Sequence, residues 1–262
     1  MKIGNSPGDP LIVVTAAHLL MRKSIFVSVA ADSELIAWLG ARGSNEVVLN
    51  ERSWVLAGDR LRTRYQLDDN GSKLYATHPD SLIDIAAFPL TIGVRGELDG
   101  GPIKVARVKS IGEGYPLPRR EVTLGMSVFF LGFPNVPGTD GILPVLRAGS
   151  IARIGSGSEF LIDGVSLGGN SGSPVFLAGG VTTPASKPAL LEIQQPRFLG
   201  MVVGHLGQSG VFVEPSGDGR VTFVAREIEN LGLARACWSD DILKVAEAAM
   251  VQAAKIREKM KP

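Results

Sequence analysis

Residues 166–176 read SLGGNSGSPVF, and their centre, Gly169-Asn170-Ser171-Gly172, sets one hydroxyl among residues with little side chain. Such a stretch is either a turn between strands or a serine nucleophile with space for a substrate. A serine nucleophile needs a base, an acid that orients the base, and N–H donors aimed at the developing oxyanion. A glycine at 169 lets the backbone turn so that its own N–H and that of Ser171 point to one spot.

The other two groups are sought among the histidines and the aspartates. His18 follows an apolar run in IVVTAAHLL, where small alanines leave room for a neighbouring strand or a substrate. Asp84 lies between two isoleucines in SLIDIAAF, where a carboxylate without a partner would be costly to bury. Other aspartates, at positions 68, 69 and 80, lie in polar turns. We therefore expect His18 to be the base and Asp84 the acid, and we expect His78, beside a proline, at the surface.

Short apolar runs indicate the fold class. They hold four to nine residues, are rich in Val, Ile and Phe, and are bounded by turn residues: LIVVTAA, SIFVSVA, EVVLN, SVFFLGF, EFLID, SPVFLA, FLGMVVGHL, GVFVEP and RVTFVA. This is the pattern of strands in an all-β barrel or sandwich. Near the end of the chain the period changes, and one stripe predicts a C-terminal α-helix: Ile242, Ala246, Ala249, Ala253, Ile256 and Met260.

Composition excludes several classes of function. The chain has 262 residues, 45% of them hydrophobic, and a net charge of +1 without a long basic run, so we expect no nucleic-acid partner. The apolar run at 11–21 is too short for a membrane span. Three scattered histidines and one cysteine have no metal-ligand spacing, and no dinucleotide or phosphate-loop motif occurs, so we expect no metal and no cofactor. The first residues lack the apolar core of a secretory signal, which predicts a cytoplasmic protein if Met1 is the true start.

Three motifs in this order carry a family resemblance: TAAH (15–18), DIAAF (84–88) and GGNSGSPVF (168–176). Together they resemble the trypsin-like (chymotrypsin-fold) serine proteases, and among these the bacterial peptidase domains related to HtrA/Deg. FFLGFP (129–134), RAGSIARI (147–154), Asp163 and FLGMVVGH (198–205) resemble further parts of that family. The resemblance covers roughly residues 11–230.

The resemblance implies an all-β fold of two β-barrels, followed here by the C-terminal helix. Residues 1–112 would form the N-terminal barrel with His18 and Asp84, residues 113–230 the C-terminal barrel with Ser171, and residues 231–262 a helical segment. The implied activity is that of a serine endopeptidase whose partner is a protein or peptide substrate. Gly169 and Ser171 would supply the oxyanion-hole N–H groups.

Specificity and activation are also implied by the resemblance. The specificity pocket would have its base near Val165, with Val202, Val203 and His205 on the flanking strand, and the lack of an acid there favours a small or medium apolar P1 residue. Asn170 stands where digestive proteases carry the aspartate that binds a newly cut N-terminus, so no activation by such a cut is expected.

The sequence departs from the family at two places. Only 17 residues precede His18, whereas related proteases have two more strands there, so the first barrel is expected to be incomplete at its N-terminus. Ser173 replaces the usual second glycine after the nucleophile. Two alternatives stay open: a catalytically silent protease-fold binding module or truncated fragment, and an esterase of the α/β-hydrolase class. The esterase would need Gly-x-Ser-x-Gly with its acid and histidine after the serine. The sequence indicates no oligomeric state.

Overall fold

The computed structural model describes residues 11–20, 24–30, 46–49, 52–57, 60–69, 72–90, 97–98, 101–102, 116–134, 144–179, 181–182, 192–193, 196–215 and 221–259. The chain divides into two compact units, which are described one by one. Unit 1 comprises Met1–Glu113 with Leu243–Pro262, and unit 2 comprises Gly114–Ile242. Residues 103–115, which include the predicted domain boundary at residue 112, lie outside the described residues. Within the described part of the chain, no helix combines the length and the hydropathy of a membrane span.

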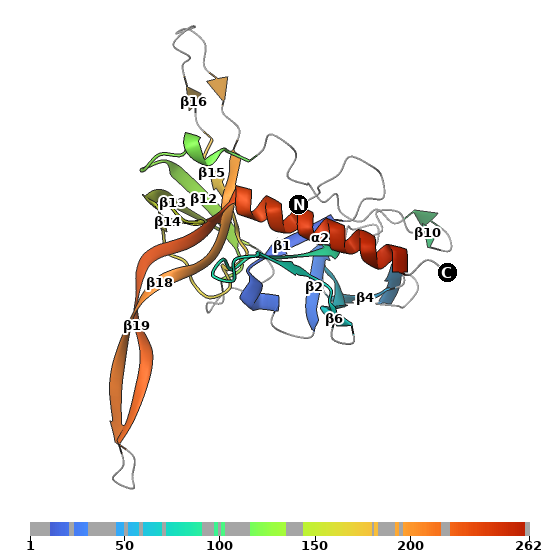
Figure 1. Cartoon of the computed structure of the whole chain (residues 1–262), viewed down its shortest axis with the longest axis horizontal. Coiled ribbons are helices and arrows are strands. Elements are labelled where there is room, and N and C mark those ends of the chain that lie inside the picture. The colour runs from blue at the N-terminus through green and yellow to red at the C-terminus, as the bar shows by residue number, and fades with distance from the viewer. Residues whose placement is uncertain are drawn as a thin grey trace. The chain divides into compact units, whose positions relative to one another are not determined.

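Unit 2 is built on a closed antiparallel barrel of six strands in the order β12-β13-β14-β19-β18-β15 (Figure 1). The barrel strands are β12 (Ser127–Gly132), β13 (Val145–Ile154), β14 (Glu159–Asp163), β15 (Pro174–Leu177), β18 (Arg197–Pro215) and β19 (Val221–Trp238). Unit 2 also contains the 3-10 helix η2 (Arg119–Glu121) and the short strand pair β16 (Val181–Thr182) and β17 (Glu192–Ile193).

Alternation of side chains explains why these strands close around one core. In β12, Val128, Phe130 and Gly132 are buried, while the residues that alternate with them are exposed or half-buried. This is the period of two expected for a strand with one face inward. The core also contains Phe160 and Trp238, whose rings lie 4.2 Å apart between centroids. Burying one such aromatic side chain contributes on the order of 2 kcal/mol.

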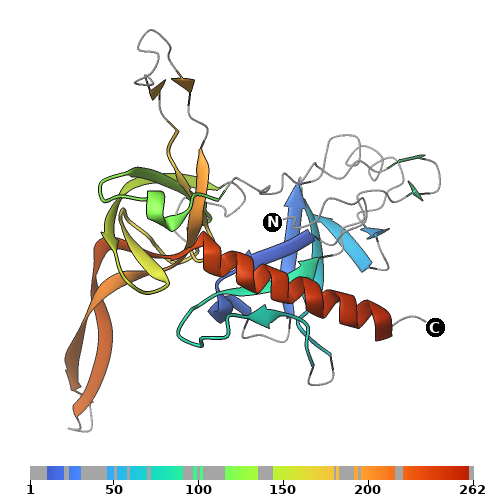
Figure 2. The ribbon, with the colours of Figure 1, turned by 45° about the horizontal axis from the view of Figure 1, so that its top comes forward.

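The last two barrel strands continue past the barrel as a long hairpin. Their pairing runs from Gly200 opposite Trp238 to Pro215 opposite Val221. β15 pairs β18 only at Arg197–Met201, and β14 pairs β19 only at Leu233–Cys237. Figures 1 and 2 show the resulting two-stranded extension of unit 2. The predicted boundary at residue 230 is wrong, because β19 continues to Trp238 and residues 231–238 are barrel strand rather than helical segment.

Unit 1 contains two larger sheets. A three-stranded sheet has the order β1-β9-β8, and a four-stranded sheet has the order β2-β5-β4-β3. Their strands are β1 (Leu11–Thr15), β2 (Ser24–Ala30), β3 (Glu46–Leu49), β4 (Arg52–Ala57), β5 (Arg60–Gln66), β8 (Ala76–Thr77) and β9 (Ala86–Leu90). The small strands β6 (Asp68–Asp69), β7 (Ser72–Lys73), β10 (Glu97–Leu98) and β11 (Gly101–Pro102) pair two by two. A 3-10 helix, η1 (Ala17–Leu20), follows β1.

The predicted C-terminal helix is confirmed as α2 (Ser239–Lys259). Three residues of the predicted stripe, Ile242, Ala246 and Ala249, are buried, as a helix with one apolar face requires. The remaining stripe residues, from position 253 on, lie outside the side chains that the structure describes.

The prediction of a mostly β fold with a barrel and one C-terminal helix is therefore confirmed in this coarser form. The barrel is that of unit 2. The described strands of unit 1 form separate sheets rather than a second closed barrel.

Candidate functional site

One group of candidate residues lies in unit 1, where β1 and β9 run antiparallel. The end of β1, Thr15, is opposite the start of β9, Ala86. His18 follows β1 and Asp84 precedes β9, so both lie at the same edge of the sheet although 66 positions separate them. The N–H of Ala17 donates to the main-chain oxygen of Asp84 at 3.3 Å, which joins the two connecting segments.

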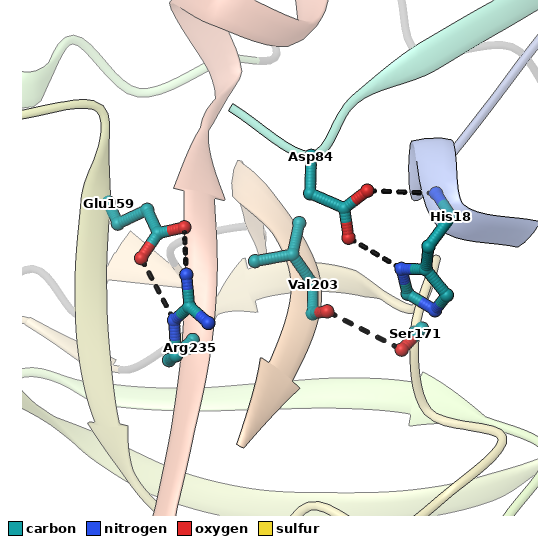
Figure 3. Close-up of polar contacts among 6 residues, drawn as sticks. All are labelled: His18, Asp84, Glu159, Ser171, Val203 and Arg235. Atoms are coloured by element: carbon teal, nitrogen blue, oxygen red, sulfur yellow. Dashed lines mark hydrogen bonds and ion pairs between the residues drawn. The ribbon is translucent and has the colours of Figure 1, made fainter. Parts of the chain in front are cut away.

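His18 and Asp84 form a two-point contact (Figure 3). The main-chain N–H of His18 donates to Asp84 Oδ1 at 2.9 Å, and the ring Nδ1 lies 2.5 Å from Asp84 Oδ2. The His18 side chain is 43% exposed and that of Asp84 28% exposed. Asp84 is thus half-buried at the start of β9, beside Ile85, which is fully buried.

The chemical consequence is a histidine ring with a fixed orientation. A carboxylate can only accept hydrogen bonds, so the contact with Asp84 selects the tautomer of His18 that carries its proton on Nδ1. Nε2 then keeps its lone pair and can take a proton from a donor. The sequence-predicted base and acid are thus in contact with each other, in the arrangement that orients a general base.

A second group of candidate residues lies in unit 2 and comprises residues 167–173, which we call the nucleophile turn after the role predicted for Ser171. The N–H of Asn170 donates to Leu167 O at 3.0 Å, and the N–H of Ser173 donates to Asn170 O at 3.0 Å. The turn is tied to β18 because Gly172 N–H donates to Val202 O at 2.8 Å and Val202 N–H donates to Ser173 O at 2.9 Å. Gly169 (φ 93°) and Gly172 (φ 90°) adopt backbone conformations that favour glycine, so the turn requires glycine on both sides of Ser171.

Gly169 and Ser171 keep main-chain N–H groups without an acceptor in the part of the chain that the structure describes. Asn170, Gly172 and Ser173 all donate, whereas the N–H groups of Gly169 and Ser171 donate to no oxygen of the described residues. These are the two donors that the sequence assigned to the oxyanion hole. An unused pair of main-chain donors beside a serine is the minimum that such a hole requires.

Ser171 itself is half-buried, and its Oγ lies 3.5 Å from the main-chain oxygen of Val203 (Figure 3). This distance marks a weak hydrogen bond. Among the described residues of unit 2, the hydroxyl therefore has no strong hydrogen-bond partner.

The residues predicted for a specificity pocket fall into different environments. Val165 is 47% exposed and Val203 is 5% exposed. His205 is half-buried and lies opposite Ala234 in β19. Val202 lies in β18, and its side chain is fully buried in the barrel core.

One histidine differs from its predicted environment. His78, expected at the surface, is only 8% exposed. Its main-chain N–H donates to Ile85 O at 3.1 Å, and its ring Nδ1 accepts from the N–H of Asp80 at 3.1 Å. The sequence placed His78 by its neighbouring proline, whereas pairing of β8 with β9 buries it against the segment that leads out of Asp84.

Two residues that sequence reasoning missed, Gly132 and Asn230, contact the segment around Ser171. Gly132 in β12 lies against the side chains of Asn170 and Ser173. Asn230 in β19 donates from Nδ2 to Ser166 O at 2.6 Å and accepts from Gly232 N–H at 2.9 Å. The signal for Gly132 was a glycine inside an otherwise apolar strand, which often marks a close approach. Asn230 has no comparable signal in the sequence.

A bidentate ion pair braces the outside of the barrel near this segment. Arg235 Nε and Nη2 donate to the two carboxylate oxygens of Glu159 at 3.0 and 2.7 Å (Figure 3). Arg235 lies opposite Leu161 in β14 and Gly204 in β18, so the pair ties neighbouring strands together.

Comparisons with known proteins assign neither a family nor a function to this chain. No family model matches the sequence, and no curated protein sequence is significantly similar to it. Among the described residues, no group of three or more His, Cys, Asp or Glu side chains could hold a metal ion.

Proposed function

We propose that the protein is a serine endopeptidase of the trypsin-like type. The observation that carries the proposal is the carboxylate of Asp84, which accepts from both the main chain and the ring of one histidine. A surface ion pair needs only one such contact. The additional main-chain bond supports a role in fixing the direction of the His18 ring.

The proposed reaction begins at Ser171. Nε2 of His18 takes the proton of the Ser171 hydroxyl as Oγ forms a bond to the carbonyl carbon of the scissile peptide. The carbonyl oxygen becomes an oxyanion, which the N–H groups of Gly169 and Ser171 stabilise. Each such donor is worth on the order of 100-fold in kcat.

Collapse of this intermediate breaks the carbon–nitrogen bond. His18 gives the proton to the leaving amine, and the acyl group stays on Ser171 as an ester. Water then attacks the ester with His18 again as the base, and the carboxylic acid product leaves with Ser171 restored. Asp84 holds the Nδ1–H tautomer and stabilises the imidazolium without taking the proton.

This reaction requires Nε2 of His18 in unit 1 to come within about 3 Å of Ser171 Oγ in unit 2. The proposed fold is therefore the two-barrel arrangement of the family that the sequence resembles. Within the part of unit 2 that the structure describes, Ser171 Oγ has only a weak partner, which supports the proposal because the hydroxyl is available to a stronger acceptor.

The proposed substrate is a polypeptide with a small or medium apolar P1 residue. Val165 is half-exposed and apolar at the start of the segment that leads to Ser171, and Val203 lies beside the Ser171 hydroxyl. A pocket between such residues favours apolar side chains over lysine or arginine.

Cleavage of a peptide library tests the activity. We expect wild-type protein to create new termini after apolar residues of small or medium size, and we expect Ser171→Ala to create none. A folded wild-type protein that binds peptides but leaves them intact would contradict the proposal and support a catalytically silent binding module.

A further inference from the structure

Gly132 occupies the last position of β12 and is buried beneath the nucleophile turn. A Cβ added to Gly132 would lie 2.5 Å from Asn170 Oδ1 and closer still to Ser173 Oγ. Ordinary contacts with a Cβ begin at 3.4 Å, so these two side chains fill the space that the glycine leaves. They would have to move by about 1 Å to admit a methyl group.

Burying the Asn170 side chain in this space costs free energy. Its side chain is 0% exposed, and neither Oδ1 nor Nδ2 has a hydrogen-bond partner among the described residues. Leaving a buried polar group unpaired costs roughly 1–3 kcal/mol. Ser173 is also buried, at 4% exposure. A buried amide without partners is a feature that stability alone does not explain.

The backbone couples these two side chains to Ser171. Asn170 and Ser173 lie on either side of the nucleophile, and the Ser173 N–H donates to Asn170 O across it. Displacing either side chain from Gly132 therefore displaces the peptide units that carry the unused N–H groups of Gly169 and Ser171. Main-chain bonds of Gly172 and Val202 hold the turn to β18, so β12 and β18 support it from two strands.

We propose that Gly132, Asn170 and Ser173 form a positioning cluster, the Gly132 cluster, that fixes the oxyanion donors of Gly169 and Ser171 against the barrel. The inference rests on the proposed function, since it assigns a role in the same reaction. The three residues touch no reacting atom. They act by setting where the nucleophile turn lies.

The test is the rate constant for labelling of Ser171 by a fluorophosphonate in Gly132→Ala. The three atoms nearest to the added methyl belong to the side chains of Asn170 and Ser173, which can turn, so the barrel is expected to fold and to lose less melting temperature than after a clash with the main chain. The turn shifts instead, and a displacement near 1 Å in such a site lowers the rate roughly tenfold to a hundredfold.

Gly149→Ala is the matched control in the same barrel. A Cβ there would collide with the main-chain oxygen of Asp163 and lie 2.8 Å from Ile162 Cγ2, where β13 pairs with β14. Backbone cannot move aside as a side chain can, so Gly149→Ala is expected to lower the melting temperature while its folded fraction labels at the wild-type rate. If Gly132→Ala loses as much melting temperature as Gly149→Ala, the glycine is structural and the inference is overturned.

A compensating change gives a second readout. In Gly132→Ala with Ser173→Ala, the hydroxyl is gone and the Asn170 amide can turn into the vacated space. We expect the double variant to label faster than Gly132→Ala alone, which a general loss of stability does not predict. If the rate losses of Gly132→Ala and Ser173→Ala multiply in the double variant, the cluster does not position the donors. The same conclusion follows if Gly132→Ala labels at the wild-type rate. If folded wild-type protein does not label at all, the proposed function fails instead.

Discussion

The carboxylate of Asp84 accepts two hydrogen bonds from a single residue, His18, one from its main chain at 2.9 Å and one from its ring at 2.5 Å. The first bond fixes the start of η1 relative to β9, and the second fixes the ring. Because β1 and β9 are antiparallel neighbours, a short connection at one edge of the sheet is enough to bring the two residues together.

Asp84→Asn is expected to leave unit 1 folded and to lower kcat for peptide cleavage by about 10³–10⁴. An amide can present its NH₂ group to Nδ1, which selects the wrong tautomer of His18. Asp80→Asn is the matched control, because Asp80 lies in the same connecting segment and, among the described residues, its side chain accepts only from the Leu82 N–H. Equal activity of Asp84→Asn and wild type would mean that the carboxylate has no part in catalysis.

Asn230→Ala is expected to lower the free energy of unfolding by about 2 kcal/mol in urea. The change removes the side-chain donor to the main-chain oxygen of Ser166 and the acceptor for Gly232 N–H. Ser166 is only 1% exposed, so water cannot readily replace the lost donor. Leu231→Ala, at the adjacent and half-exposed position, is expected to change stability by less than about 0.5 kcal/mol. An unchanged urea midpoint in Asn230→Ala would show that the Ser166 contact carries no stability.

Asn170→Asp is expected to make stability depend on pH. Burial disfavours the charged form, so the new carboxyl has a higher pKa in the folded state than its unfolded value of about 3.9. Its ionisation therefore destabilises the fold as pH rises above about 4, by roughly 3 kcal/mol once the folded form ionises as an unpaired charge. The difference in melting temperature from wild type should shrink as pH falls toward 4. The neutral variant Asn170→Ala should show no such trend, and a parallel trend in both variants would refute the explanation.

Glu159→Gln is expected to have only a small effect. The ion pair with Arg235 is bidentate, but the Arg235 side chain is 39% exposed and water screens the interaction. We expect a loss of about 0.5 kcal/mol in the free energy of unfolding, which declines further with added salt. A loss of several kcal/mol would mean that the pair is the main brace between β14 and β19.

Strand content could be predicted from the sequence because Val, Ile and Phe runs between turn residues are local features. Strand length could not. FLGMVVGHL and GVFVEP read as two strands, yet they are one strand, β18, because the polar residues between them pair with β19. The same pairing extends β19 to Trp238, eight residues past the predicted boundary at 230. Partner strands far away in the sequence decide such extensions.

The environment of the residues predicted for the specificity pocket depends on a register shift in β18, which the alternation of apolar and polar residues in the sequence does not show. The pairing of β18 with β19 shifts between Val202 and Gly204, which leaves Val203 as an extra residue in its strand. The side chain of Val202 packs into the core, and alternation along the sequence does not indicate the extra residue that follows it. The contact of His18 with Asp84 was predicted from residue chemistry, whereas the pairing of β1 with β9 that produces it is non-local and came only from the structure.

The central claim is that His18 activates Ser171, and the most direct measurement is the site and rate of fluorophosphonate labelling. We predict one adduct, located on Ser171 by peptide mass analysis, formed at least a hundredfold more slowly in His18→Ala and absent in Ser171→Ala. Folded wild-type protein that carries no adduct, or an adduct on Ser171 that forms equally fast in His18→Ala, would contradict the account.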